Sequence, residues 1–193
     1  DDAWADVYGH AGNQVGDSDA EDACPVISTG GSSGDFDILR TGCFVFDTSG
    51  LGDADTKVSA VFSLFGTATA DELSQTVRMT ASAPASNTAL ASSDFPNRVH
   101  TLQSDTSIAF GSFSASGYND FNLNSTGLGN VALDAVSKFG CECLADNTNS
   151  PPSHASETTA YTSIRFADQS GTSSDPKLAV VHISPFTPRL IMF

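Results

Sequence analysis

Positive charge is scarce in this chain. Its 193 residues include only 8 Lys and Arg against 23 Asp and Glu, so the formal net charge at pH 7 is −15. A surface of this sign repels the phosphates of nucleic acids and the headgroups of anionic membranes. We therefore expect no nucleic-acid partner. The excess of carboxylates instead favours solubility and the binding of cations.

Long apolar runs are also missing. No stretch approaches the roughly 18–20 apolar residues that cross a bilayer, and no signal peptide is present, so we expect no membrane span. The chain opens with Asp1-Asp2-Ala3-Trp4, without an initiator Met. Either a leader has been removed or the chain has been trimmed. We favour a processed, exported protein that is extracellular or lies on a virion surface.

Recognisable catalytic patterns are lacking as well. The Gly30–Gly34 stretch matches the G-x-S-x-G motif of hydrolases, but that motif needs a strand before it and a helix after it. Here the stretch is a Gly/Ser loop that precedes a predicted strand. The four histidines do not pair at ligand spacing, and no acid–base pair or activated nucleophile can be placed. We therefore expect a protein that is not an enzyme.

Composition and periodicity predict an all-β fold. The apolar content is a modest 39%, and Ser, Thr, Ala, Gly, Asn and Asp are abundant, which suits short strands joined by polar turns. Apolar side chains recur at every second position between 58 and 64. Residues 3–8 are expected to form a first strand, and helical spacing predicts one short helix over 126–137. We predict about ten short strands in one jelly-roll-type β-sandwich domain, residues 1–193.

Five segments, taken in order, resemble a family of β-sandwich modules, the DNRLRE-type, disaggregatase-related domains of secreted polysaccharide-active proteins and of phage or environmental viral structural proteins. These segments are 43–51 (CFVFDTSGL), 57–64 (KVSAVFSL), 86–95 (SNTALASSDF), 117–124 (GYNDFNLN) and 166–178 (FADQSGTSSDPKL). The resemblance implies a jelly-roll sandwich that binds glycan or builds a surface structure. It does not extend to the first thirty-odd residues or to the tail after Ser184.

An even number of cysteines in an exported chain indicates disulfides. Cys141 and Cys143 lie two apart on a predicted strand, so they share a face and a direct bridge between them would be strained. Their available partners are Cys24 and Cys43, or a cysteine of another subunit. Zinc is the alternative, but this spacing suits it poorly. We favour disulfides, each of which stabilises by roughly 2–4 kcal/mol.

An acidic cluster provides the candidate metal site. Asp17, Asp19, Glu21 and Asp22 alternate with small residues in a predicted loop and could offer oxygens to Ca²⁺. The EF-hand pattern fails because Asp22 occupies the turn position at which Gly is required. The alternative is a solvated acidic loop. Ca²⁺ is the only cofactor that the sequence suggests.

Aromatic residues and one sequon offer further candidates. Trp4, Tyr8, Tyr118 and Tyr161 could stack on sugar rings, although packing in the core or at strand edges is the simpler interpretation. Asn124-Ser125-Thr126 is an N-glycosylation sequon, which matters only if the producing cell modifies such sites.

The chain closes on four consecutive apolar residues, Leu190, Ile191, Met192 and Phe193. Burying them would contribute roughly 5–10 kcal/mol, at ~1.5–3 kcal/mol per side chain. Ordering them costs a similar amount, at ~1–2 kcal/mol per residue, so they need a groove, either their own or a neighbour's.

This tail sets the functional expectation. We predict a structural, non-enzymatic subunit of an extracellular or virion-surface homo-oligomer, in which residues 1–30 and 185–193 act as assembly arms. The alternative is a carbohydrate-binding module of an exported protein, whose tail folds back on its own sandwich.

Overall fold

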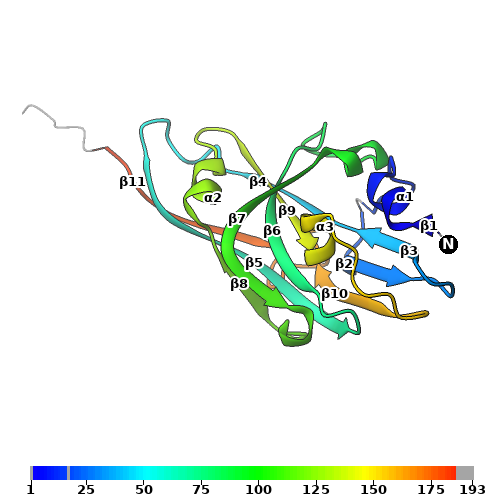
Figure 1. Cartoon of the computed structure of the whole chain (residues 1–193). Helices are drawn as coiled ribbons and strands as arrows, with labels where there is room; N and C mark the ends of the chain where they lie inside the picture. Colours follow the sequence, from blue (N-terminus) through cyan, green and yellow to red (C-terminus); the bar gives the residue numbers. More distant parts are fainter. Residues whose placement is uncertain (1, 17, 186–193) are drawn as a thin grey trace, which may run out of the picture.

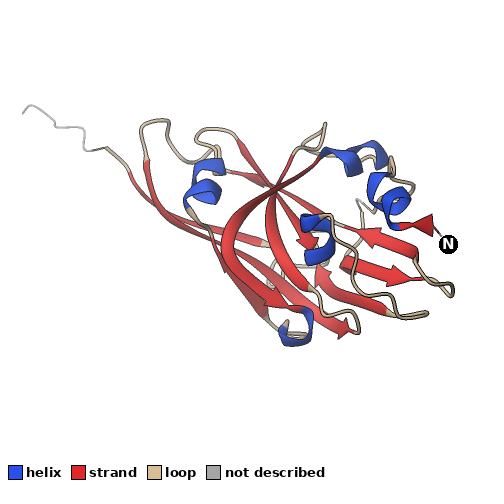
Figure 2. Ribbon diagram, viewed as in Figure 1, coloured by secondary structure: helices blue, strands red, loops and turns tan. Residues whose placement is uncertain are grey.

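Two antiparallel β-sheets form the molecule (Figures 1 and 2). The computed structural model describes residues 2–16 and 18–185. Within these residues the sheets pack over a shared apolar core, which confirms the predicted all-β sandwich. No helix in the described ranges is long and apolar enough to cross a membrane.

The larger sheet has seven strands, six of which lie along one path. In spatial order these are β1 (Asp2–Ala3), β3 (Asp35–Arg40), β2 (Glu21–Thr29), β10 (Thr159–Arg165), β5 (Thr56–Asp71) and β11 (Lys177–Ile183). The seventh, β8 (Tyr118–Asn122), pairs with the middle of β5. β5 is long enough, at 16 residues, to pair with β11 through its first half and with β10 through its second half.

The smaller sheet has four strands, in the order β4 (Gly42–Asp47), β9 (Val136–Cys143), β6 (Thr76–Ser82) and β7 (Arg98–Ala109). β4 and β7 are therefore its edges. Short helices lie in the connections between strands: α1 (Trp4–Gly9), η1 (Ser92–Asn97), η2 (Phe110–Ser112), α2 (Ser125–Asn130) and α3 (Leu144–Thr148).

Two sequence predictions of secondary structure are wrong. The expected first strand, residues 3–8, is α1 apart from Ala3, because Trp4 and Tyr8 are four apart and share one helical face, with ring centroids 5.6 Å apart. The expected helix over 126–137 ends at Asn130. Asp134 then adopts a left-handed φ of 53°, which turns the chain into β9.

The core between the sheets is rich in phenylalanine. Phe62 of β5 is fully buried, and its ring centroid lies 5.2 Å from Phe44, 5.4 Å from Phe46 and 5.9 Å from Phe139. Offset and edge-to-face pairs of this kind add to the stabilisation that burial provides. Because Phe44 and Phe46 belong to β4 and Phe139 to β9, this cluster ties the edge of the small sheet to the large one.

α2 packs closely against β7 at a glycine. A Cβ on Gly127 would lie 2.1 Å from the carbonyl oxygen of Gln103, closer than any real contact, whereas one on Gly129 would meet nothing within 4 Å. Glycine at position 127 is therefore required by the approach of the two backbones.

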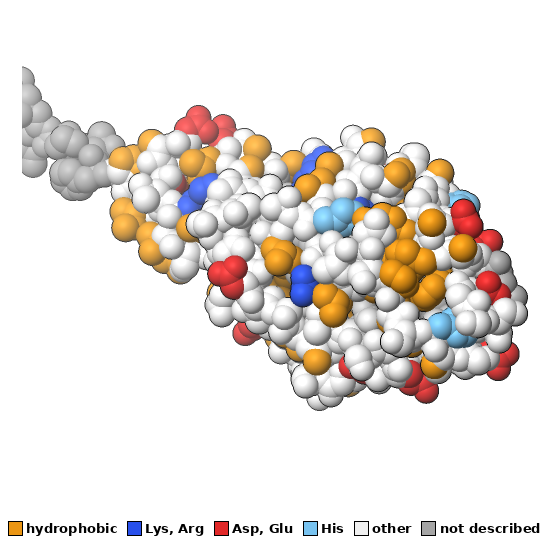
Figure 3. Space-filling view, viewed as in Figure 1, with side chains coloured by type: hydrophobic (Ala, Val, Ile, Leu, Met, Phe, Trp, Pro, Cys, Tyr) orange, Lys and Arg blue, Asp and Glu red, His pale blue; other side chains and the backbone are white. Residues whose placement is uncertain are grey.

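The sandwich is elongated. α1 and β3 lie at one end, and the last residues of β11 lie at the opposite end (Figure 1). Val181 and Ile183 of β11 are more than half exposed, as is Val58 of the neighbouring β5. Apolar atoms gather at this end of the molecule in the space-filling view (Figure 3).

Candidate functional site

A groove runs along edge strand β4. Its volume is about 960 Å³, which is near the upper end of the roughly 300–1,000 Å³ typical of ligand sites. We call it the β4 groove. It is lined chiefly by residues 12–16, 22–24, 37–46, 86–90, 166–168 and 175–176.

One wall of the groove is a free strand edge. Within the described residues, β4 pairs only with β9. The amide of Thr48 donates to the carbonyl of Ala135 at 2.9 Å, which extends this ladder by one residue. Hydrogen bonds alternate along an antiparallel pair, so Phe46 and Phe44 also bond to β9. The N–H and C=O groups of Cys43, Val45 and Asp47 therefore point away from β9, and those of Cys43 and Val45 belong to groove-lining residues.

The lining mixes apolar and acidic side chains. Val15 and Ile38 are 46% and 37% exposed, and Phe44 stacks on Phe166 with ring centroids 6.1 Å apart. Arg40 is the only Lys or Arg among the described lining residues, and it is held by Asp22 at 2.9 Å. The other carboxylates of the lining lie on Asp2, Asp19, Asp37, Asp168 and Asp175. The groove therefore favours an apolar ligand that carries a positive charge.

The loop of residues 86–90, which also lines the groove, is fixed by Asp94. Its carboxylate accepts from the amides of Ala85 and Ala91, both at 2.9 Å. These bonds, the one from Ala85 first, lower the pKa of Asp94 because they favour its charged form. A Cβ on Gly12, whose φ is +79°, would lie 2.2 Å from the carbonyl of Ser92, so the N-terminal segment runs tightly against this loop.

A smaller pocket of about 80 Å³, which shares Val15 and Cys43 with the groove, is lined by Arg98 and Glu142. These two residues belong to a group of charged side chains that we call the Arg98 cluster: Arg98, His100, Glu142 and Asp146. Arg98 and His100 lie on β7, Glu142 on β9 and Asp146 on α3. The cluster therefore spans β7 and β9, which flank β6 in the small sheet, and it contacts Tyr8 of α1.

Arg98 anchors α1 to the sandwich. Its Nη2 donates to the carbonyl of Tyr8 at 2.9 Å, and its guanidinium lies 3.8 Å from the ring centroid of Phe95 and 5.1 Å from that of Tyr8. Such cation–π contacts strengthen when the cation is removed from water, and the side chain of Arg98 is only 7% exposed.

His100 continues the link between α1 and the sheet. Its Nε2 lies 3.0 Å from the hydroxyl of Tyr8, and its Nδ1 lies 2.8 Å from Oε2 of the buried Glu142. Thr80 donates to the other carboxylate oxygen at 3.2 Å, and Asn147 donates to Oε2 at 3.3 Å. The carboxylate of Glu142 is therefore well supplied with partners.

Asp146 is less well supplied. It is fully buried, and its Oδ1 lies 3.3 Å from Nε of Arg98, but neither carboxylate oxygen makes a hydrogen bond with a described side chain or backbone group. Burial raises the pKa of Asp146 to about 7, an effect that Arg98 opposes and Glu142 reinforces. A carboxyl group in this position exchanges its proton near neutral pH.

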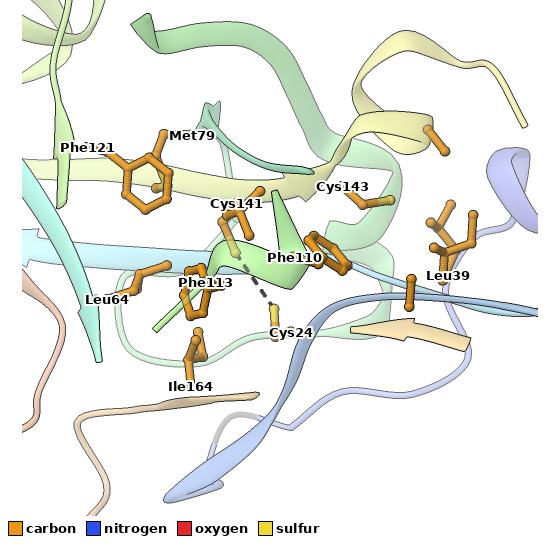
Figure 4. Packing of buried hydrophobic residues seen from close by; sticks show 14 of the residues in the cluster. Cys24, Leu39, Leu64, Met79, Phe110, Phe113, Phe121, Cys141, Cys143 and Ile164 are labelled. Atoms are coloured by element: carbon orange, nitrogen blue, oxygen red, sulfur yellow. Dashed lines mark hydrogen bonds between the residues drawn. The ribbon is translucent and has the colours of Figure 1, made fainter. Parts of the chain in front are cut away.

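The cysteines are free thiols, in contrast to the predicted disulfides. Cys24 and Cys141 face each other across the core from β2 and β9, with sulfurs 3.9 Å apart, well beyond the ~2.05 Å of a disulfide bond (Figure 4). Cys143 is fully buried near Asp146, and burial raises its pKa. Cys43 accepts from the hydroxyl of Ser82 at 3.0 Å. The sulfurs act as core side chains, and only Cys43 is partly exposed.

The predicted calcium residues are not brought together in the described part of the chain. Asp17 lies outside the described residues. Glu21 and Asp22 are adjacent on β2 and so point to opposite faces, where each pairs with an arginine, Arg165 at 3.1 Å and Arg40 at 2.9 Å. Among residues 2–16 and 18–185, no group of three or more His, Cys, Asp or Glu is placed to hold a metal ion, and this includes Asp19.

Asn124 has a structural role. Its Oδ1 accepts from the amide of Gly127 at 2.9 Å and caps α2, while its Nδ2 donates to Asp105 at 3.1 Å. Nδ2 also donates to the carbonyl of Leu102 at 3.4 Å, so a glycan, which replaces one of the two amide hydrogens, would remove one of these two bonds. Glycosylation at this sequon stays a prediction.

Of the aromatic candidates, Trp4, Tyr8 and Tyr118 make contacts within the molecule, and Tyr161 is half-buried on β10. Trp4 lies edge-on to Phe36, with centroids 5.2 Å apart, and its Nε1 donates to Asn149 at 3.0 Å. The hydroxyl of Tyr118 donates to the carbonyls of Ser173 and Asp175.

The predicted assembly arms have different outcomes. Leu190, Ile191, Met192 and Phe193 lie outside the described residues. Of residues 1–30, the stretch 21–29 is β2, an inner strand whose last six residues are buried, so an arm could include only the residues before it.

The Arg98 cluster was missed at the level of sequence because its members lie up to 48 residues apart, from 98 to 146. One signal was present. Glu142 stands between two cysteines at the buried end of β9, after Phe139 and Gly140, where a charged residue requires a buried partner.

Comparisons with protein-family models, curated proteins and solved structures find no match for this chain. The resemblance to DNRLRE-type modules therefore stays a prediction.

Proposed function

We propose that this protein is a non-enzymatic structural subunit of an extracellular or virion-surface assembly, in which copies associate head to tail through their terminal segments. The observation that carries the proposal is the polarity of the sandwich. The N-terminal elements lie at one end, and the chain leaves β11 at the other (Figure 1).

Polarity of this kind suits a heterologous contact, in which one surface of a subunit binds a different surface of the next. Such contacts build rings or filaments, depending on whether the rotation between subunits closes. The apolar residues at the β11 end, Val58, Val181 and Ile183, support an interface there, because exposed strand edges with apolar side chains readily pair with another chain.

The test is the size of the full-length protein in solution, measured by light scattering and negative-stain electron microscopy. The double variant Ile191→Asp/Phe193→Asp should be folded but monomeric. The matched control Ser184→Asp/Thr187→Asp adds the same charge outside the apolar stretch and should assemble as the wild type does. Normal assembly of the first variant would contradict a role for the tail.

A carbohydrate-binding module is the second candidate, and the β4 groove favours it. The groove has the volume of a ligand site, and its carboxylates can accept hydrogen bonds from sugar hydroxyls. This function predicts a monomer that is retarded in a polysaccharide affinity gel, and Asp37→Ala or Asp168→Ala should abolish the retardation.

A further inference from the structure

We propose that the β4 groove is the receptor for residues Leu190–Phe193 of a second copy, which add as a strand to the outer edge of β4. This inference rests on the proposed self-association and assigns it a site.

The backbone of β4 is suited to accept a strand. The outward N–H and C=O groups of Cys43 and Val45 belong to residues that line the groove, and β4 has no partner on this side within the described ranges. An added strand would complete the ladder of the small sheet and make it five-stranded. Four residues in extended form span about 13 Å and β4 spans about 20 Å, so the segment fits along the strand.

The side chains of the groove match the composition of the tail. Alternate residues of an added strand would face the apolar lining formed by Ile38, Phe44 and Phe166. Arg189 directly precedes the apolar stretch and is one of only eight Lys and Arg in the chain. The carboxylate of Asp168 on the lining would attract it, as would that of Asp175, which accepts from the side-chain amide of Gln169 at 3.0 Å. Arg40, the one Lys or Arg among the described lining residues, is already held by Asp22.

The direction of β11 favours the tail of a second copy, and not the chain's own tail, as the occupant of the β4 groove. Asp175 and Pro176 line the groove, and β11 then runs seven residues away from it, about 20 Å, to Ile183. The chain leaves β11 at the end of the molecule opposite to α1 (Figure 1). A tail that fills its own groove would have to reverse along the whole of β11.

The site can be blocked without touching the tail. Val45→Pro removes an N–H that points into the groove and leaves the bonds of Phe44 and Phe46 to β9, because proline is tolerated on an edge strand when its nitrogen faces outward. Val45→Thr keeps the N–H and the β-branched shape and is the matched control. Ile38→Asp, at an exposed position on the wall, is a second blocking variant if the proline variant fails to fold.

The decisive experiment mixes two full-length variants with complementary defects. The groove variant Val45→Pro and the tail variant Ile191→Asp/Phe193→Asp should each be monomeric, even at about ten times the concentration at which the wild type assembles. Their equimolar mixture should form a heterodimer and nothing larger, because it retains one intact groove and one intact tail. Val45→Thr should assemble like the wild type.

Hydrogen exchange provides an independent readout. In the wild-type assembly the amides of Cys43 and Val45 should be protected, and in the tail variant they should exchange quickly. The amides of Phe44 and Phe46 should stay protected in both, because they bond to β9.

The outcomes separate the two proposals. If the tail variant is monomeric but Val45→Pro and Ile38→Asp both assemble, the β4 groove is not the receptor, although the tail still drives association. If the tail variant assembles normally, both proposals fail. If the wild type were monomeric and its own tail protected the amides of Cys43 and Val45, the second-copy assignment would be overturned. If the wild type were monomeric and retarded in a polysaccharide affinity gel, the groove would be a glycan site.

Discussion

Replacing Asp146 with Asn should change how the stability of this protein depends on pH. Asp146 is fully buried on α3 and lies 3.3 Å from Arg98, yet burial outweighs that cation and raises its pKa to about 7. The folded protein therefore binds this proton more tightly than the unfolded chain, in which the pKa is near the ordinary value of 3.8. Asn has a similar shape and is neutral at every pH.

The sign and size of the effect follow from linkage. Because the pKa is raised on folding, Asp146 costs no stability below about pH 3.8, costs more as the pH rises, and reaches its full cost above about pH 7. A shift of about three units corresponds to about 4 kcal/mol at 1.36 kcal/mol per unit. Between pH 5 and pH 8, we expect the free energy of unfolding of the Asn variant, relative to wild type, to rise by about 3 kcal/mol.

Urea unfolding of both proteins at pH 5 and pH 8, at constant ionic strength, measures this difference. Trp4, the single tryptophan, reports on α1 by fluorescence, and far-ultraviolet circular dichroism reports on the sheets. The opposite result would refute the reasoning. If the Asn variant were less stable than wild type by a similar amount at both pH values, Asp146 would be an ordinary charged partner of Arg98, and burial would not dominate its pKa.

Three further predictions concern packing and accessibility. Phe62→Ala should lower the free energy of unfolding by about 3–5 kcal/mol, because it removes the fully buried ring on which three others pack. A loss of less than about 1 kcal/mol in chemical denaturation would contradict the central position of this ring. Gly127→Ala should lower the melting temperature, because its Cβ would lie 2.1 Å from a backbone carbonyl, whereas Gly129→Ala, with open space around it, should leave the melting temperature unchanged or raise it. A maleimide should modify only Cys43 in the native protein and all four cysteines after denaturation, as counted by intact mass spectrometry. If a buried thiol were modified as fast as Cys43 in the native protein, the core would have to open.

Much of the fold could be predicted from the sequence because local patterns encode it. Alternation from 58 to 64 correctly placed part of β5, in which Phe62 and Leu64 are buried. The local pattern was misleading where the same residues fit both the strand period and the helix period. Trp4 and Tyr8 fit either an aromatic strand or one face of a helix, and contacts with Phe36 and Arg98, distant in sequence, decide for the helix.

The candidate site could not be predicted, since it depends on pairing between distant segments. Whether β4 is an edge or an inner strand is decided by which strands it pairs with, and residues 42–47 read the same in either case. Likewise, Glu142 and His100 become partners only because β7 and β9 lie on either side of β6. For the cysteines, the sequence predicted an interaction that the structure does not contain. Their even count predicted disulfides, whereas the free thiols pack as small apolar side chains.

The position of β2 has a consequence for synthesis. This strand is early in the chain and its last six residues are buried. It lies between β3 and β10 in the large sheet, but β10 does not begin until Thr159. At ribosomal speeds of roughly 5–20 residues per second, one flank of β2 waits on the order of ten seconds for its partner. During that time β3, which follows directly, is the one strand with which β2 can form its native pairing. The hairpin of β2 and β3 therefore has to persist as a nascent-chain intermediate, and a holdase that binds it should raise the yield of folded protein.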